Sequence, residues 1–187
     1  MSEASCLKNH FLIALPSLQD RNFSRSVTYL CEHTDNGTMG IIINRPSSLK
    51  LADILQHMEI EETEQTPGNL PIFIGGPVQE DRGFLLHSPA KRWKSTLVIT
   101  DELAITTSQD ILEAIASGEG PEEVLIALGY AGWGPGQLEG ELQQDSWLVA
   151  PASHEIIFHT PVEERWEAAA ALAGVDLNLI TSTAGHA

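Results

Sequence analysis

The chain has 187 residues, of which 42% are hydrophobic and 19% charged. That balance is typical of a globular domain and excludes a disordered chain or a helical membrane protein. Asp and Glu number 26 against 10 Lys and Arg, which gives a formal net charge of -16. Because so acidic a chain repels phosphate backbones and anionic membranes, we expect neither direct nucleic-acid binding nor membrane association.

The N-terminal stretch MSEASCLKNHFLIALP contains one short apolar run, with no basic segment before it and no small-residue cleavage site after it. We therefore expect no export signal. The two cysteines, Cys6 and Cys31, do not form a CxxC pair. In a chain without an export signal they are expected to be reduced thiols, one of them in a core strand.

The first part of the chain predicts three strands and then a helix. Apolar runs at 11–15, 26–32 and 41–44 predict the strands, and Asn36-Gly37 predicts a hairpin between the last two, because Asn-Gly accepts the positive φ angles of a tight turn. The helix follows from apolar residues spaced i, i+3, i+4 and i+7, namely Leu51, Ile54, Leu55 and Met58. The glutamate-rich stretch EIEETEQTPGN after it is expected to be a solvated loop.

The rest of the chain predicts two helices among further strands. Strands are expected at 70–74, 83–87, 96–100, 124–130, 147–151 and 155–160. The segment TSQDILEAIASG predicts a helix capped by Thr107 or Ser108 and closed by Gly118. The segment PVEERWEAAAALAG predicts a second helix that ends at Gly174.

Strands outnumber helices, and several follow one another through short turns. No strict βαβ alternation, internal repeat or low-complexity linker is present. The pattern therefore predicts an α+β fold with an antiparallel or mixed sheet, and residues 1–187 are expected to form a single domain.

Motifs that define common reaction types are absent. The chain has no GxxxxGK[ST] loop for nucleotide phosphates, no GxSxG serine elbow, and no HExxH or CxxC pair for zinc. None of the seven histidines pair at i, i+4 on a predicted helix, so they are interpreted as separate structural or surface residues unless the fold brings ligands together. No metal site and no cofactor is predicted.

Polar residues and glycines cluster at the ends of predicted strands. They are Arg25-Ser26, Glu32-His33, Asn44-Arg45, Gly75-Gly76, His87 and the turn around Trp133. If the strands share a sheet, these residues can converge on one binding surface. The alternative is a buried structural network in which Arg25 or Arg45 pairs with Glu32 or Glu139.

The chain resembles the YqgE/AlgH family. The resemblance rests on FLIALPSLQDRNFSRSVTYLCEHTDNGTMGIIINRP, FIGGPVQEDRGFLLHS, ALGYAGWGPGQLEGEL, DSWLVAP and the terminal AGHA, which occur in this order and together span nearly the whole chain. It implies a bent, bifurcated sheet that forms a pseudo-barrel with helices packed outside. It also implies a bacterial cytoplasmic protein without a settled activity, in a family with one branch named for transcriptional control of alginate synthesis.

The family's pattern falls on residues without assigned roles. They are Arg25, Ser26, Glu32, His33, Asn44, Pro46, Gly75, Gly76, Pro77, His87, Gly129, Tyr130, Gly132, Trp133, Gly134, Gly136, Gln137, Leu138 and Glu139.

The glycine-rich stretch GYAGWGPGQLEGEL is expected to end a core strand at Tyr130, to reverse sharply over 131–136 and to begin a short helix over 137–144. We hypothesise that Trp133 lies at the mouth of a shallow groove. The other groove residues would be Tyr130, Gln137, His33 and Arg25. The hypothesis fails if Trp133 is buried among apolar side chains.

These observations favour a regulatory or adaptor protein, monomeric or dimeric, that binds a protein partner or a small anionic ligand. The candidate binding residues are Arg25, Ser26, Glu32, His33, Asn44, Arg45, Gly75, Gly76, His87, Tyr130, Trp133, Gln137 and Glu139. The alternative is a hydrolase-like enzyme in which His33 or His87 acts as base and Arg25 or Arg45 holds an anionic substrate.

Overall fold

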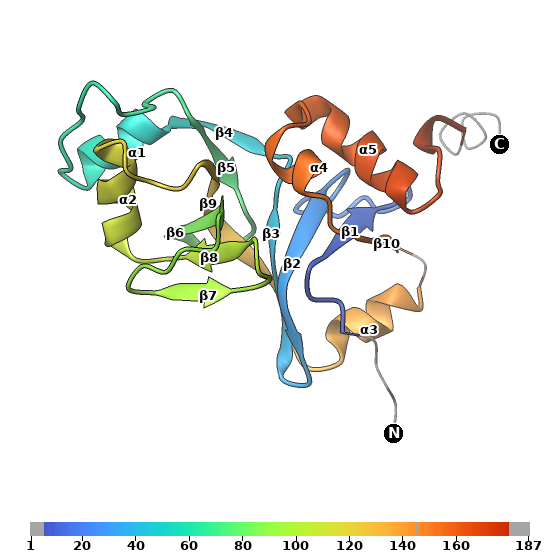
Figure 1. The fold of residues 1–187 in the computed structure, drawn as a ribbon. Helices are drawn as coiled ribbons and strands as arrows, with labels where there is room; N and C mark the ends of the chain where they lie inside the picture. The colour runs from blue at the N-terminus through green and yellow to red at the C-terminus, as the bar shows by residue number, and fades with distance from the viewer. Residues whose placement is uncertain (1–5, 145, 180–187) are drawn as a thin grey trace.

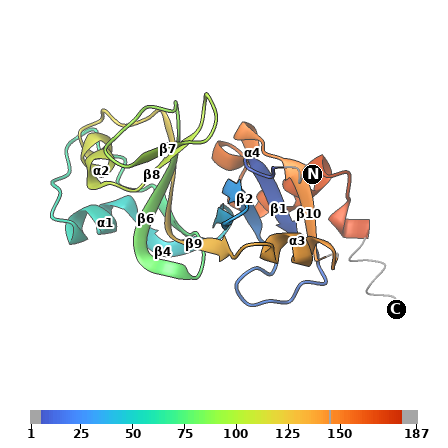
Figure 2. The same cartoon turned by 90° about the horizontal axis from the view of Figure 1, so that it is seen from below.

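Ten strands form one curled sheet in the computed structural model, which describes residues 6–144 and 146–179 (Figure 1). The strand order is β10-β1-β2-β3-β9-β6-β8-β7, with β5 paired to both β4 and β9. The predicted α+β fold, with a bent mixed sheet and helices packed outside it, is confirmed (Figures 1 and 2). The single-domain assignment of residues 1–187 stays a prediction.

One side of the sheet consists of four antiparallel strands. They are β1 (His10–Ala14), β2 (Val27–Thr34), β3 (Gly37–Ile42) and β10 (Trp147–Pro151). The predicted hairpin between β2 and β3 is present, but Thr34 pairs with Gly37, so the turn is one residue earlier than expected. Gly37 has a φ of +137°, and a Cβ there would lie 2.7 Å from the carbonyl oxygen of Trp133.

The long strand β9 (Glu123–Trp133) connects this side of the sheet to the other. Its first half lies between β5 (Pro71–Ile74), which runs parallel to it, and the antiparallel β6 (Val78–Ser88). Its last residues pair with β3 instead, so the sheet divides along β9 (Figure 2). The predicted reversal over 131–136 is wrong, because pairing with β3 keeps the chain extended through Trp133 and leaves only 134–136 for the turn into α3 (Gln137–Leu142).

The other side contains short strands that the sequence pattern only partly predicts. β7 (Thr96–Val98) and β6 match predicted strands, whereas β4 (Pro46–Lys50) and β8 (Ala104–Thr106) were not predicted. Both unpredicted strands exist through their tertiary partners, β4 on β5 and β8 between β6 and β7.

Helices α1 (Leu51–His57) and α2 (Gln109–Ala116) cover this second side, and their apolar faces share one buried cluster with β5, β6 and β9. The loop between α1 and β5 is not simply solvated. The hydroxyls of Thr63 and Thr66 donate to the carbonyl of Ala116, at 2.7 and 2.5 Å, and tie the loop to the end of α2. Gly118 ends α2 with a φ of +83°, as predicted.

Helices α4 (His154–Phe158) and α5 (Arg165–Leu172), joined by a 3-10 turn at Val162–Glu164, cover the first side (Figure 1). The predicted strand at 155–160 is wrong. The hydroxyl of Ser153 accepts a hydrogen bond from the backbone N–H of Ile156 at 3.2 Å, which caps a helix, and the apolar residues that suggested a strand are buried against the sheet. The Trp166 indole donates to the carbonyl of Ala14 at 2.8 Å and holds α5 on β1.

Cys31 is buried in β2, as predicted for one cysteine, and Cys6 is exposed; neither forms a disulfide in the described chain. Across residues 6–144 and 146–179, no helix combines the length and the apolar character needed to cross a membrane.

Candidate functional site

The predicted binding residues do not all converge on one surface. Asn44 lies at the end of β3, where its side chain accepts a hydrogen bond from the N–H of Val27 and donates one to the carbonyl of Arg25, both at 2.9 Å. The guanidinium of Arg45 donates to the carbonyls of Asn22 and Ser24. This first group therefore fastens the loop before β2. Arg25 itself lies over the Trp166 ring, 5.1 Å from its centroid, and Ser26 is buried.

The second group is the pair His33 and Glu139. His33 Nε2 lies 2.9 Å from the Glu139 carboxylate, and His33 Nδ1 accepts a hydrogen bond from the N–H of Leu7 at 2.8 Å. The predicted pairing of Arg25 or Arg45 with Glu32 or Glu139 is thus wrong, because the partner of Glu139 is a histidine. Both nitrogens of His33 have structural partners.

His87 is fully buried in β6. Its Nε2 lies 2.7 Å from the Thr106 hydroxyl, and its Nδ1 lies 3.0 Å from the carbonyl of Pro89. Burial lowers the pKa of His87. The hydrogen bond to the carbonyl of Pro89 raises it but does not outweigh burial, so the neutral imidazole is favoured. The residue joins β6 to β8 and does not face solvent.

The hypothesis that Trp133 lies at the mouth of a groove is wrong. The residue is only 4% exposed and packs on Phe23 and Trp147, with ring centroids 5.7 and 6.3 Å away. Its indole N–H donates to Glu141 at 3.1 Å. Gln137 accepts a hydrogen bond from the N–H of Gly134 at 2.9 Å, so it closes the turn before α3.

Gly75 and Gly76 serve the backbone. A Cβ on Gly76 would lie 2.1 Å from the carbonyl of Tyr130, and a Cβ on Gly75 would lie 2.3 Å from the carbonyl oxygen of Gly129. Glycine is required at both positions because the segment between β5 and β6 passes directly against β9.

A surface groove does exist, and three of the predicted residues, Glu32, Tyr130 and the nearly buried Trp133, line it. It consists of two adjoining depressions that share Met39 and Tyr130. The first, of about 480 Å³, is lined by Glu32, Thr34, Asn36, Gly37, Thr38, Met39, Val78, Tyr130, Gly132 and Trp133. The second, of about 470 Å³, is lined by Met39, Gln79, Arg82, Phe84, Lys94, Ser95, Thr96, Leu97, Ile105, Thr107 and Tyr130, and is called the Arg82 depression below.

A bulge in β6 shapes the Arg82 depression. Val78 pairs with Tyr130, and the next pair is Gly83 with Leu128, so residues 79–82 stand opposite Gly129 alone. Gln79 adopts a φ of +50°, a left-handed conformation that is uncommon outside glycine. Bulges and such backbone outliers are common beside functional sites, because they redirect side chains.

The bulge brings a cation over an aromatic floor. The guanidinium of Arg82 lies 5.6 Å from the centroid of Phe84, which in turn packs edge-on against Tyr130 at 5.5 Å. Arg82 makes two long hydrogen bonds, at 3.3 Å to Gln79 and 3.4 Å to Thr107. Within the described residues it forms no salt bridge with a carboxylate. Sequence analysis missed Arg82 and Lys94, although the polar run QEDR inside an apolar strand pattern was a usable signal of a bulge.

A second group that the sequence analysis missed is Glu123 with His154 and His159. His154 Nε2 lies 2.5 Å from one Glu123 carboxylate oxygen, and His159 Nε2 contacts the other. The view that all histidines are separate is wrong for these two, which share one carboxylate. Burial raises the pKa of Glu123, but the hydrogen bonds and charges of the two imidazoles outweigh it and lower that pKa below its usual value.

The chain thus has the fold of a small α+β protein. Its curled sheet divides along β9, the crossing there requires glycine, and its helices pack outside the sheet. The chain belongs to the AlgH-like family, whose model matches residues 11–178. It is 56% identical over 180 residues to a UPF0301 protein of Nitrosococcus oceani, covering 96% of each chain. It is 57% identical over 185 residues to one of Methylococcus capsulatus, covering 99% of this chain and 98% of that one.

Two solved structures are similar to the whole fold. The solution structure of the AlgH protein from Pseudomonas aeruginosa is 51% identical, with a TM-score of 0.81, and the match covers 100% of this chain and 99% of that one. A crystal structure of a Corynebacterium diphtheriae protein matches with a TM-score of 0.72 at 22% identity, over 90% and 87% of the two chains. The second supports the fold alone.

Proposed function

We propose that this protein is a cytoplasmic regulatory protein that binds a small anionic molecule with an apolar or aromatic body in the Arg82 depression. The observation that carries the proposal is the placement of Arg82 on a strand bulge, above the Phe84 ring and without a carboxylate partner in the described chain. Arginine binds carboxylate and phosphate groups bidentately, and the aromatic floor offers an apolar contact for the rest of the ligand.

The net charge of -16 does not prevent anion binding at this place. At physiological ionic strength, exposed charges more than about 8 Å apart are largely screened from each other. The charges near the depression therefore decide whether an anion binds there. Lys94 also lines the depression, although its ammonium group interacts with the carboxylate of Asp110 as well. A hydrogen bond to a charged group contributes roughly 1.5–3 kcal/mol, which raises the affinity for an anion roughly 10- to 150-fold.

The regulatory role is taken from the family's name and from the lack of support for the enzyme alternative. His33 and His87 have both ring nitrogens engaged, and neither lines the groove. Arg25 and Arg45 hold backbone and aromatic partners. An effect on transcription would therefore act through the bound ligand or a protein partner, since the acidic surface disfavours contact with DNA.

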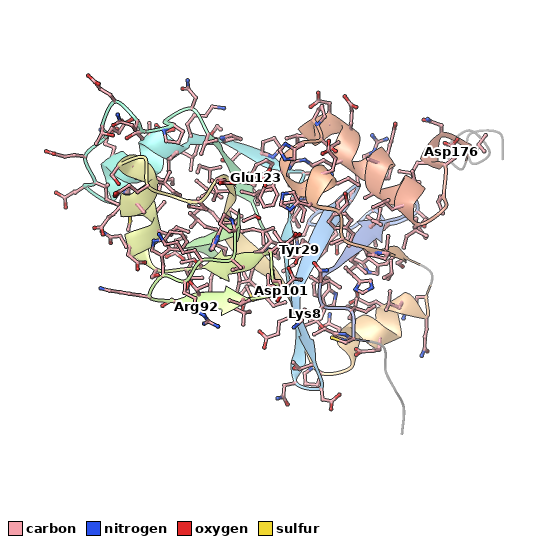
Figure 3. The ribbon with its side chains drawn as sticks, in the orientation of Figure 1. Lys8, Tyr29, Arg92, Asp101, Glu123 and Asp176 are labelled. Atoms are coloured by element: carbon pink, nitrogen blue, oxygen red, sulfur yellow. The ribbon has the colours of Figure 1, made fainter. Side chains whose placement is uncertain are left out.

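The proposal is tested by thermal unfolding of the protein with a panel of dicarboxylates, sugar phosphates and nucleotides. A ligand at a hundredfold excess over its dissociation constant stabilises the folded state by about 2.7 kcal/mol. The shift should be lost in Arg82→Gln and kept in Arg92→Gln, a matched variant of an exposed arginine that does not line the depression (Figure 3).

Equal shifts in both variants would contradict the proposed site. No shift with any compound would contradict small-ligand binding and leave a protein partner as the reading to pursue.

A further inference from the structure

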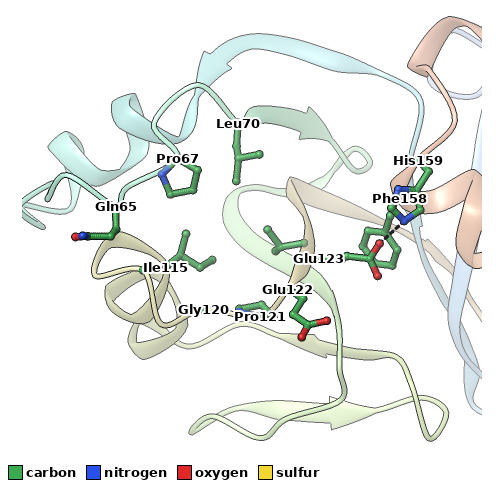
Figure 4. A pocket seen from close by; sticks show the side chains of 12 residues that line it. Gln65, Pro67, Leu70, Ile115, Gly120, Pro121, Glu122, Glu123, Phe158 and His159 are labelled. Atoms are coloured by element: carbon green, nitrogen blue, oxygen red, sulfur yellow. Dashed lines mark ion pairs between the residues drawn. The ribbon is translucent and has the colours of Figure 1, made fainter.

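Glu123, His154 and His159 offer three ligand atoms that all lie within 4.8 Å of one another. They lie apart from the Arg82 depression, beside a cavity of about 440 Å³ that Glu123 and His159 help to line. Figure 4 shows the two side chains pointing toward each other at one end of that cavity. Apolar side chains such as Leu70, Ile115 and Val124 line the rest of it.

The fold brings these residues together although their spacing does not suggest it. Glu123 is the first residue of β9, and His154 is the first residue of α4. On a continuous helix, residues i and i+5 would point about 140° apart. His159 follows the last residue of α4 with φ -121° and ψ -25°, so the chain has left the helix and its imidazole turns back to Glu123.

The three side chains are accessible enough for an ion to reach them. His154, Glu123 and His159 have side-chain exposures of 36%, 24% and 50%. The cluster could serve only to fasten α4 to β9, but ion pairs between side chains that are this accessible contribute little to stability.

We propose that Glu123, His154 and His159 bind one divalent first-row transition metal ion, such as zinc, with an open coordination position toward the cavity. Two imidazoles and one carboxylate suit zinc, cobalt or iron(II), whereas magnesium and calcium prefer oxygen ligands alone. Three protein ligands with a vacant fourth position are typical of sites that also bind water or a small molecule.

The change in geometry that metal binding requires is small. In a tetrahedral site with bonds of about 2.0–2.1 Å, neighbouring ligand atoms lie roughly 3.3 Å apart. The 2.5 Å contact between His154 and Glu123 must therefore open by less than about 1 Å, and ligand atoms up to 4.8 Å apart must close by no more than about 1.5 Å. Rotation of the partly or fully exposed imidazoles allows both changes. Metal binding requires both Nε2 atoms to be without a proton, so that each neutral imidazole carries its proton on Nδ1.

Cobalt(II) is the probe that tests the proposal, because tetrahedral and five-coordinate cobalt absorb visible light much more strongly than the octahedral aqua ion. The titration uses tag-free, full-length protein carrying Cys6→Ser, so that the exposed thiol cannot contribute. We expect one equivalent to bind, with absorption that is displaced by zinc. The absorption should be lost in Glu123→Gln and in His159→Gln, and kept in Glu119→Gln and His57→Gln, which change exposed residues away from the cluster.

A circular dichroism spectrum of each variant checks that it is folded. If a ligand variant does not fold, X-ray absorption of the zinc-loaded Cys6→Ser protein decides instead, with two imidazoles expected in the metal's first coordination shell. Weak binding without visible absorption, binding that survives both ligand substitutions, or fewer than two imidazoles would overturn the proposal.

Discussion

His33 and Glu139 are 106 residues apart in the chain, yet His33 Nε2 lies 2.9 Å from the Glu139 carboxylate. Because the N–H of Leu7 donates to His33 Nδ1, the ring proton resides on Nε2 and points to Glu139. The contact joins β2 to α3 and fixes the helix that follows the glycine-rich turn.

This contact predicts a specific dependence of stability on pH. The hydrogen bond from His33 lowers the pKa of Glu139 below its usual value. Stability from the ionised carboxylate is therefore fully present above the ordinary glutamate pKa of about 4.3 and is lost as the pH falls through the lower folded value.

Urea unfolding of the wild type and Glu139→Gln between about pH 7 and pH 3 measures the effect. The difference between the two free energies of unfolding should shrink as the pH falls. A difference that stays constant over that range would contradict the role assigned to His33.

The crossing of β9 predicts that Gly129 does not tolerate a side chain. Gly129 has a φ of +79°, and a Cβ there would lie 2.4 Å from the carbonyl oxygen of Gly76. Gly129→Ala should destabilise the protein by at least about 2 kcal/mol, through strain at a special backbone conformation.

Gly140 is the matched control for this prediction. It lies within α3, and a Cβ there would meet nothing within 4 Å. Gly140→Ala should stabilise the protein by roughly 0.5–1 kcal/mol, because alanine favours a helix over glycine. Chemical denaturation of both variants measures the two changes in the free energy of unfolding. Similar changes for the two substitutions would show that the crossing at β9 is not tightly packed.

Glu141 explains why two tryptophans can be buried beside the glycine-rich turn. Its Oε1 accepts hydrogen bonds from the indole N–H groups of Trp133 and Trp147, both at 3.1 Å. Glu141→Ala removes the acceptor of two largely buried donors and should cost roughly 1–3 kcal/mol of unfolding free energy. Tryptophan fluorescence during denaturation measures it.

Glu113→Ala, on the exposed face of α2, is the control and should change stability by less than about 0.5 kcal/mol. If Glu141→Ala is as mild, the indole groups do not depend on that carboxylate.

The sequence predicts those parts of the fold that local patterns encode. The helix face of Ile111, Leu112 and Ile115 and the closing Gly118 were correct, because spacing and a positive φ are local properties. The predicted strand at 155–160 was wrong because Ile156 and Ile157 have strand-like side chains, while the cap at Ser153 and burial against the sheet select a helix.

The candidate sites depend on contacts between distant segments, which local patterns do not contain. Phe84 packs on Tyr130 through the register of β6 on β9, and Arg82 lies over Phe84. Even if the strand predicted at 155–160 had begun one residue earlier, His154 and His159 would have pointed to opposite faces of it. They meet at Glu123 because α4 ends between them.

Amide NMR of the isotope-labelled full-length protein can show directly whether the Arg82 depression binds an anionic molecule. The similar AlgH protein has a solution structure, so the method suits this fold. Phenyl phosphate and benzoate serve as minimal probes that combine an anion with an aromatic body. We expect saturable shifts of amide signals confined to residues 39, 79–84, 94–97, 105, 107 and 130, which Arg82→Gln abolishes and Arg92→Gln preserves. Saturable shifts elsewhere, or none with either probe, would contradict it.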